Sequence, residues 1–168
     1  MDLQKIKLEI LKESNKDIGV DCRWIMRALP EQFGDRIIQD QLMRDADKYP
    51  TMVAKLDGDI IGFLTYKELL PESVEMCTIG VLPQYHKQGI GNYMQDTMLS
   101  HLKSEGYKIV QIKLVAADYS TLDLGWARRL GFSPLELHPN WCWRANTNGC
   151  NCRYPHGTIP CLIIAKTL

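Results

Sequence analysis

Hydrophobic and polar residues alternate along several short stretches of the chain. Ile6, Leu8 and Ile10 alternate with charged residues, and this period of two is typical of a half-buried strand. Two further apolar runs are joined by Asp57-Gly58, a dipeptide that favours a tight hairpin because both residues reach positive φ. The pattern predicts strands over about 6–10, 52–56, 60–66, 74–81, 108–115 and 161–166.

Helical spacing replaces this alternation in the intervening segments. The region from about 16 to 46 reads as helical, and Pro30 and Gly34 divide it into two helices. A further helix is expected between Ser120, as its N-cap, and Gly131. The longest helix begins after the loop at Pro83 and presents four apolar residues on one face: Ile90, Met94, Met98 and Leu102.

Alternating strands and helices predict an α/β fold with a mixed sheet. The chain has 168 residues, which fits a single domain spanning residues 1–168. Hydrophobic residues make up 45% and charged residues 24%, as in an ordinary globular protein.

Charge and hydropathy exclude some classes of partner. Lys and Arg number 20, as do Asp and Glu, so the net charge is zero and a protein that binds nucleic acid by neutralising phosphates is excluded. The apolar runs are far shorter than the about 20 residues that cross a membrane, and the N-terminus lacks the apolar core of a signal peptide. A cytoplasmic protein without a membrane partner is expected.

The C-terminal region is rich in cysteine and resembles an insertion at about 138–159. Its thiols and one imidazole could form a zinc site or a redox disulfide, but they lack the paired Cys-x-x-Cys spacing of zinc ribbons. Free thiols in a loop that shapes the substrate pocket are the favoured interpretation, so no metal is predicted. The residues concerned are Cys142, Cys150, Cys152 and His156.

The segment from Thr78 to Asn92 carries the most chemical information. It reads as a strand, a loop with Gly89 and Gly91, and the start of an amphipathic helix. The first N–H groups of a helix lack intrahelical partners and lie at the positive end of its dipole, so this arrangement suits a phosphate or pyrophosphate. The alternative is that the two glycines only shape a turn. Met94 stands at the third glycine position of a dinucleotide fingerprint, and no Gly-Lys-Ser/Thr ending is present.

This segment resembles the GNAT superfamily of acetyl-CoA-dependent N-acetyltransferases. The family signature is Arg or Gln, two residues, Gly, one residue, then Gly or Ala, and this chain has His86-Lys87-Gln88-Gly89-Ile90-Gly91. Asp57 to Phe63 is similar to the second hairpin of the family, Leu130-Gly131-Phe132 to its late Gly-Phe signature, and Pro160 to Lys166 to its closing strand. The resemblance implies a mixed, mostly antiparallel central sheet flanked by about four helices.

The resemblance also implies binding residues for acetyl-CoA as co-substrate. The backbone of the strand end should bind the pantetheine arm, and the N–H groups from Lys87 to Asn92 should hold the pyrophosphate. His86 departs from the signature and is either a weaker contributor or an exposed loop histidine. The implied residues are Ile79, Gly80, Val81, His86, Lys87, Gln88, Gly89, Ile90, Gly91 and Asn92, with Ser120 where an asparagine is frequent.

Two positions bear on proton transfer. Glu75 stands where some members of the family carry a glutamate base, and an even step of six residues would place it on the same side of the strand as Val81. The alternative is a solvated strand carboxylate, and Glu68 and Glu72 are weaker candidates. Ala127 occupies the position of the usual tyrosine acid, so Tyr119, Tyr93 or water would have to substitute.

These observations favour an N-acyltransferase that moves an acetyl group to a small-molecule or peptide amine by direct attack in a ternary complex. The main alternative is a CoA-binding sensor without turnover, and a metal-binding interaction module is a third reading that depends on the tail alone. A homodimer is the oligomeric state considered. The acidic residues between Glu31 and Asp47 hint at a cationic acceptor, although basic residues are interleaved with them. Trp24 and Trp126 are expected in the core.

Overall fold

The computed structural model describes residues 2–12, 18–33, 36–115, 124–138 and 161–168. The strands are β1 (Lys7–Leu11), β2 (Thr51–Leu56), β3 (Asp59–Leu70), β4 (Ser73–Val81), β5 (Ile109–Val115), β6 (Ser133–His138) and β7 (Cys161–Thr167). The α-helices are α1 (Ile18–Arg27), α2 (Pro30–Phe33), α3 (Arg36–Lys48), α4 (Ile90–Ser104) and α5 (Gly125–Arg129), and short 3₁₀ turns span Leu3–Lys5 and Pro83–Tyr85.

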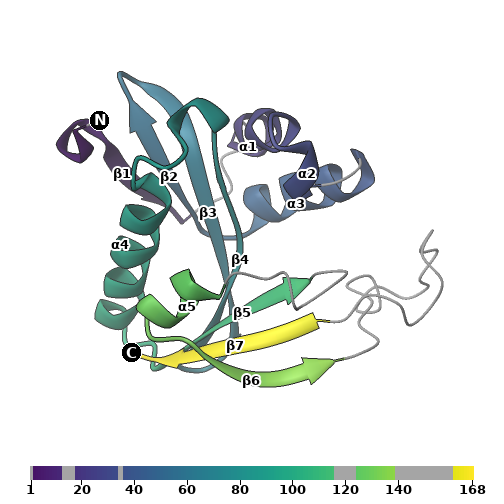
Figure 1. The fold of residues 1–168 in the computed structure, drawn as a ribbon, viewed down its shortest axis with the longest axis vertical. Helices are drawn as coiled ribbons and strands as arrows, with labels where there is room; N and C mark the ends of the chain where they lie inside the picture. The colour runs from purple at the N-terminus through teal and green to yellow at the C-terminus, as the bar shows by residue number, and fades with distance from the viewer. Residues whose placement is uncertain (1, 13–17, 34–35, 116–123, 139–160) are drawn as a thin grey trace.

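The strands form one seven-stranded sheet in the order β1-β2-β3-β4-β5-β7-β6. Strands β4 and β5 are parallel, and every other neighbouring pair is antiparallel. Figure 1 shows α1, α2 and α3 gathered on one side of β3 and β4, with α4 and α5 on the other. The predicted mixed, mostly antiparallel sheet with flanking helices is therefore confirmed.

All six predicted strands are present, and the hairpin between β2 and β3 turns through Asp57 (φ 52°) and Gly58 (φ 96°) as expected. Strand β6 was not predicted, because its bulky apolar residues Leu135 and Leu137 are 61% and 56% exposed and give no buried alternation.

The predicted helices differ from the structure at their ends. Pro30 does not simply break the first helical region but begins the short helix α2. Helix α5 begins after Leu124 as its N-cap. Ser120 and the expected insertion lie outside the described residues, save His138 in β6.

Helix α4 packs on one face of the sheet through the predicted apolar stripe. Ile90, Met94, Met98 and Leu102 are all buried, in one cluster with Val74 and Met76 of β4 and other strand residues. Each such side chain contributes about 1.5–3 kcal/mol when it is fully buried, so this face anchors the helix that follows the glycine loop.

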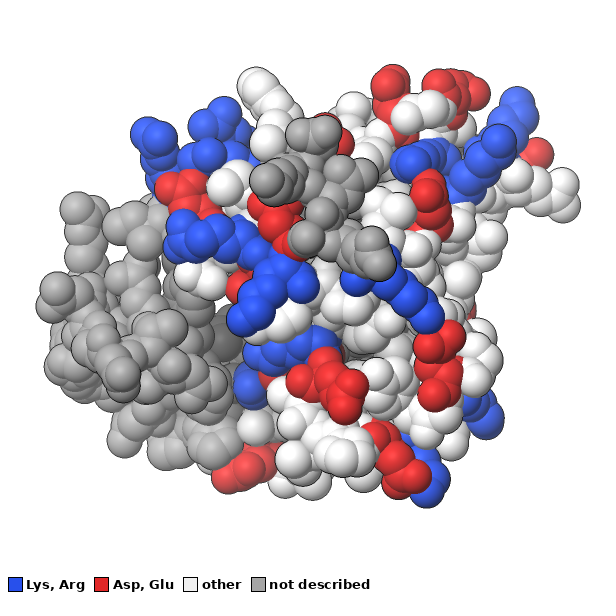
Figure 2. All heavy atoms as spheres, turned by 180° about the vertical axis from the view of Figure 1, so that it is seen from behind, with Lys and Arg blue, Asp and Glu red and all other residues white. Residues whose placement is uncertain are grey.

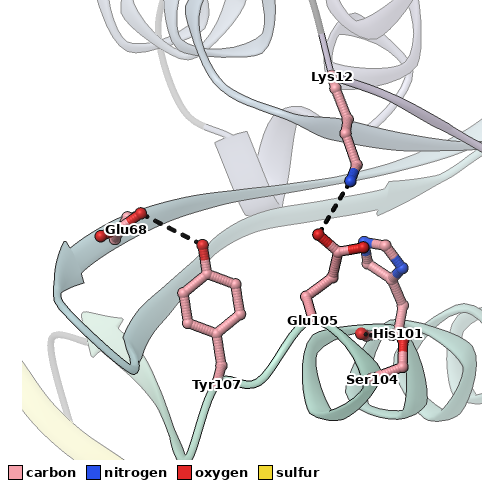
Figure 3. A network of polar contacts seen from close by, with 6 residues as sticks. All are labelled: Lys12, Glu68, His101, Ser104, Glu105 and Tyr107. Carbon is pink, nitrogen blue, oxygen red and sulfur yellow. Dashed lines mark hydrogen bonds and ion pairs between the residues drawn. The ribbon is translucent and has the colours of Figure 1, made fainter.

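A set of polar contacts ties down the opposite end of α4 (Figure 3). Lys12 Nζ donates to Glu105 Oε2 at 3.0 Å, and this hydrogen bond and the lysine charge lower the pKa of the exposed Glu105 carboxyl. Tyr107 Oη donates to Glu68 Oε2 at 3.3 Å and links the segment after the helix to β3. Both contacts are exposed, so each adds little to stability, and both lie far along the helix from the glycine loop.

The opposite face of the sheet is covered by α1, α2 and α3. Ile25, Met26 and Phe33 pack with Val53 and Phe63 of the sheet in a second buried cluster. Asp47 of α3 accepts a hydrogen bond from the Gly19 N–H at 2.9 Å and so satisfies a free donor at the first turn of α1.

The two tryptophans expected in the core behave differently. Trp24 is 63% exposed, so that expectation is wrong, and the Arg27 guanidinium lies 5.4 Å from the centre of its ring. The buried stripe of α1 runs through Ile18, Cys22, Ile25 and Met26, and Trp24 stands off it. Trp126 packs, partly buried, against the α4 side of the core.

A β-bulge at Cys77 reverses the alternation of β4. Thr78 pairs with Thr65 of β3 and Met76 pairs with Tyr66, which leaves Cys77 as an extra residue. Before the bulge Met76 contacts the α4 side of the core, and after it Ile79 and Val81 contact that same side. Glu75 and Val81 consequently lie on opposite faces, and the prediction that an even step places them on one side is wrong.

Gly80 lies on the α1 side of β4, next to side chains of β3, α1 and α2. A Cβ atom at this position would lie 2.8 Å from Phe63 Cε1 and 3.2 Å from Ile25 Cγ2, both in the buried cluster. Glycine at position 80 is therefore required by the packing of α1 and α2.

We expect Gly80→Ala to lower the free energy of unfolding by about 1–3 kcal/mol, the usual cost of overpacking a core. Gly91→Ala is the matched control, because a Cβ there meets nothing within 4 Å and alanine is the better helix former. Chemical denaturation of the ligand-free protein measures both variants. Equal stability of the two variants would contradict the role assigned to Gly80.

Candidate active site

The pairing of β4 with β5 ends before either strand does. The last paired residues are Met76 and Ile112, whereas β4 continues to Val81 and β5 to Val115. Figure 1 shows β5, β7 and β6 turning away from the upper part of β4. In the described part of the chain, no strand pairs with this edge of β4 from Cys77 onward.

The backbone of this edge is directed toward the opening. Leu82 N donates to Ile61 O of β3 at 2.9 Å, and alternate residues of an antiparallel strand direct their polar groups to opposite sides. The register with β3 is regular from Thr78 to Val81. The N–H and C=O groups of Ile79 and Val81 therefore face the side from which β5 has departed, where an extended ligand can pair with them like an added strand.

The loop that follows β4 is held by bonds from side chains to backbone. The turn Pro83–Tyr85 closes with His86 N donating to Pro83 O at 3.0 Å. Gln88 Nε2 donates to Gln84 O at 3.0 Å, and His86 Nε2 lies 2.7 Å from Val81 O. The loop thus bends back on the last residue of β4.

The N-terminus of α4 is open to an anion. Gly89 is the N-cap with φ 85°, and the first intrahelical bond runs from Tyr93 N to Gly89 O at 2.9 Å. The N–H groups of Ile90, Gly91 and Asn92 precede that bond and have no intrahelical acceptor. The first turn carries no acidic residue, and a Cβ at Gly91 would meet nothing within 4 Å. Free donors, the helix dipole and open space at Gly91 fit a phosphate group.

Glu75 is buried on the α1 side of β4, at 6% exposure. Its Oε2 accepts a hydrogen bond from Lys113 Nζ of β5 at 2.8 Å and lies 3.5 Å from Lys67 Nζ of β3. The alternative of a solvated strand carboxylate does not describe this environment. Burial would lower the pKa of Lys67, but Cys77, Glu75 and Tyr49 together raise it.

Cys77 stands at the bulge next to this ion-paired group. Its thiol donates to Glu75 O at 3.4 Å. Burial, followed by the charge of Glu75, raises the pKa of the thiol to about 12. The thiol is therefore protonated at neutral pH, and Cys77 is a poor nucleophile for a covalent acyl-enzyme.

The remaining candidates for proton transfer have other surroundings. Ala127 is buried in α5 within the α4 side of the core and can neither donate nor accept a proton. Glu68 is bonded to Tyr107, and Glu72 forms an ion pair of 2.6 Å with Lys108. Tyr93 is 36% exposed on α4, while Tyr119 and Ser120 lie outside the described residues.

Acidic residues of the α3 region are engaged in contacts within the protein. Asp40 forms ion pairs with Arg23 and Arg36, Asp45 accepts from Gln41 Nε2, and Asp47 accepts from Gly19 N. These contacts account for three of the five carboxylates that hinted at a cationic acceptor. Glu31 is exposed, and Asp35 lies outside the described residues. Figure 2 shows Lys and Arg interspersed with Asp and Glu over the back of the molecule.

Among the described residues, no group of His, Cys, Asp or Glu is arranged to hold a metal ion. Cys142, Cys150, Cys152 and His156 lie outside these residues. None of the described helices has the length and hydropathy needed to span a bilayer.

Sequence reasoning missed three residues around Glu75, namely Lys67, Lys113 and Cys77. The two lysines occupy strands on either side of β4 and meet only because Glu75 pairs with Lys67 on β3 and with Gln111 on β5. A single charged residue within an apolar run such as 109–115 was the one available signal for Lys113.

Comparison with solved structures gives similar folds over nearly the whole chain. The ribosomal-protein-S18-alanine N-acetyltransferase from Escherichia coli is 17% identical, with a TM-score of 0.65, covering 96% of this chain and 94% of that one. A GNAT family acetyltransferase from Elizabethkingia anophelis with acetyl-CoA bound is 18% identical, with a TM-score of 0.68 and coverage of 98% and 99%. An aminoglycoside 6′-N-acetyltransferase complexed with coenzyme A is 16% identical, with a TM-score of 0.70 and 96% coverage of each chain.

These identities establish a shared fold. A search of curated proteins found no match. The sequence profile of the acetyltransferase (GNAT) family matches residues 21–132, which include β4, the glycine loop and α4. Because this match spans more than half of the chain, the protein belongs to the acetyltransferase (GNAT) family, a class of enzymes.

Proposed function

We propose that this protein transfers an acetyl group from acetyl-CoA to an amine by direct attack in a ternary complex. The observation that carries the proposal is that the unpaired edge of β4 leads directly to the open N-terminus of α4. An extended arm and an anionic group joined in one ligand, as in acetyl-CoA, match these two neighbouring features.

The binding residues are those that the family resemblance implies. The backbone groups of Ile79 and the Val81 N–H pair with the pantetheine arm, whereas the Val81 carbonyl lies 2.7 Å from His86 Nε2. Gly80 between the two residues keeps α1 close to the strand. The N–H groups from Lys87 to Asn92 hold the pyrophosphate, with Gly89 and Gly91 allowing close approach. Ser120 remains a proposed contact from a part of the chain that the structure does not describe.

Acetyl-CoA supplies an activated acyl group, and the protein must deliver a neutral amine to it. An alkylamine has a pKa of about 10, so removal of its proton needs a base or a water path. Glu75 is the proposed base, acting from the face of β4 that α1 covers. Backbone N–H groups of the strand that ends at Val81 can donate to the thioester oxygen as negative charge develops on it.

Departure of the thiolate requires no acid from the protein in this scheme. A thiol has a pKa of about 8.5, which makes its thiolate a tolerable leaving group, and Ala127 offers no proton. The protonated Cys77 thiol supports direct transfer over an acyl-cysteine intermediate.

A CoA-binding sensor without turnover is the second candidate, favoured by Ala127 in place of a tyrosine. Both candidates predict binding of CoA, and release of free thiol in the presence of an amine separates them. A screen of small-molecule and peptide amines for thiol release would also identify the acceptor. Acceptor selection on charge alone is not supported, since Asp40, Asp45 and Asp47 all have partners within the protein.

Acetyl-CoA should raise the thermal stability of the protein, because a ligand that binds only the native state stabilises it. At a ligand concentration 100-fold above Kd the gain in free energy of unfolding is about 2.7 kcal/mol. Gly89→Val should abolish this gain, since a β-branched residue at φ 85° distorts the loop that presents the helix N–H groups. Thermal unfolding with and without acetyl-CoA measures the effect.

Gly58→Val provides the matched control for backbone strain. Gly58 has φ 96° and an open Cβ position, so valine there meets the same left-handed penalty of about 1–2 kcal/mol at a distant hairpin. This variant should keep the full stabilisation by acetyl-CoA. Retention of the stabilisation by both variants would show that the loop does not bind the ligand.

Glu75→Gln should lower turnover by about 10²–10⁴-fold, the usual contribution of a general base, while the affinity for CoA is kept. The ascending limb of the pH–rate profile that the base controls should also disappear where chemistry limits the rate. Steady-state kinetics with a saturating acceptor amine measures both effects.

Loss of the buried carboxylate also breaks two ion pairs, and removal of one partner of a buried pair can cost about 3–5 kcal/mol of stability. Lys67→Gln is the control, because it disturbs the same cluster but keeps the Glu75 carboxylate. If Glu75 is the base, Lys67→Gln should retain most of the turnover and the ascending limb of the pH–rate profile. Equal losses in the two variants, at temperatures where both are folded, would assign Glu75 a structural role.

A further inference from the structure

His86 is the residue at which this chain departs from the Arg or Gln of the family signature. Its ring contacts the backbone of β4. Its Nε2 lies 2.7 Å from the carbonyl oxygen of Val81. A carbonyl oxygen only accepts hydrogen bonds, so Nε2 must carry the proton of this contact. The geometry thereby selects one tautomer of the neutral ring.

This tautomer leaves Nδ1 with a lone pair. A neutral imidazole that donates from Nε2 has only an acceptor at its other nitrogen, and an acceptor cannot bind a phosphate oxygen. An arginine at this position would instead present several N–H donors and a positive charge. In this neutral form the ring of His86 is ill suited as a direct ligand of the pyrophosphate.

The carbonyl that His86 holds belongs to the functional edge of β4. Val81 is the last residue of that strand, and its polar groups face the opening beyond the β4–β5 pairing. Its carbonyl is fixed by a side chain five residues later, across the turn Pro83–Tyr85. The bond therefore sets the orientation of the peptide between Val81 and Leu82, at the point where the strand passes into the loop.

We propose that His86 is a positioning residue that holds the Val81 carbonyl and thereby orders the pantetheine-binding edge of β4. This inference rests on the proposed binding of acetyl-CoA and reassigns one of its expected contacts. His86 acts on the end of the site that binds the arm, and the pyrophosphate is left to the backbone N–H groups of the loop and helix. The side chain of Gln88, which follows Lys87 in the sequence, donates to Gln84 O and stabilises the same loop.

A comparison of two ligands tests this assignment. S-Acetylpantetheine has the arm and the thioester but no pyrophosphate, whereas acetyl-CoA has all three. Removal of the hydrogen bond in His86→Ala should weaken both ligands by the same factor, about three- to tenfold. Isothermal titration calorimetry, or ligand-observed NMR for the weaker ligand, measures the two dissociation constants.

Two further variants identify the donor that matters. The Nε2 of glutamine reaches about as far as the Nε2 of histidine, so His86→Gln should restore both affinities. Asparagine places its N–H nearer the backbone, so His86→Asn should behave like alanine. A role in packing alone would not distinguish these two polar residues.

Lys87→Ala is the control for a charge contact, since Lys87 is the exposed neighbour of His86 in the loop. It should weaken acetyl-CoA more than S-acetylpantetheine, because only the former carries the pyrophosphate. If His86→Ala follows this pattern, or if glutamine fails to restore binding, the proposal is overturned and His86 is a pyrophosphate ligand or a packing residue.

The tautomer provides a test that is independent of any ligand. Nitrogen NMR of the free protein at a pH where the ring is neutral should show His86 protonated at Nε2, and protonation at Nδ1 would overturn the proposal. If wild-type protein binds neither acetyl-CoA nor S-acetylpantetheine, the proposed function fails. The tautomer measurement would still report whether His86 holds Val81.

Discussion

The bulge at Cys77 is the constraint on which the candidate site depends. One extra residue in β4 reverses both the side-chain alternation and the direction of the backbone polar groups. Before the bulge, Glu72 O accepts from Lys108 N and Ile109 N at the start of the parallel pairing with β5. Beyond it, Ile79 and Val81 present their polar groups to the same side, where no described strand meets them. The candidate site is thus an interrupted sheet edge, where the Val81 carbonyl contacts His86 and the other outward-facing groups can pair with an extended ligand.

Helices α1 and α4 pack beside this edge of β4 and are held there by different contacts. Helix α1 lies close to β4 because Gly80 has no side chain, and a Cβ there would overlap with Phe63. Helix α4 is anchored through Ile90, Met94, Met98 and Leu102, and its far end is tied by Lys12 and Tyr107 to the surrounding segments. Because this buried stripe begins at Ile90, the first residue of the helix, the packing holds the N-terminus of α4 against the sheet. The packing of the two cores therefore determines how the open edge of β4 and the N-terminus of α4 lie relative to each other.

Hydrophobic pattern was sufficient to predict most of the fold, because β1 alternates, β2, β3 and β4 contain continuous buried runs, and α4 buries a stripe at helical spacing. It failed where burial does not follow the pattern, as in β6, whose leucines are exposed, and in α1, where Trp24 faces outward. The glycine loop could be located from sequence since Gly89 and Gly91 precede an amphipathic helix. The face of β4 on which Glu75 lies could not be predicted, because a β-bulge leaves no signature in residue types. The ion pairs of Glu75 depend on strand order, which the sequence does not encode locally.

The position of Glu75 links the opening of the sheet to the proposed chemistry. The pairing of β4 with β5 ends one residue after Glu75, and Lys113 reaches Glu75 from a position on β5 just beyond the last paired residue. The ion pair therefore links the two strands where they begin to separate. Beyond this point backbone hydrogen bonds no longer join β4 to β5, and the ion pair holds them together instead. Because the pair is largely buried, breaking it costs more than at an exposed site. A carboxylate in this position can hold the two strands together at the point where the sheet opens. If Glu75 acts as the proposed base, proton transfer to it weakens the same contact, so the proposal couples proton transfer to the geometry of the opening through one side chain.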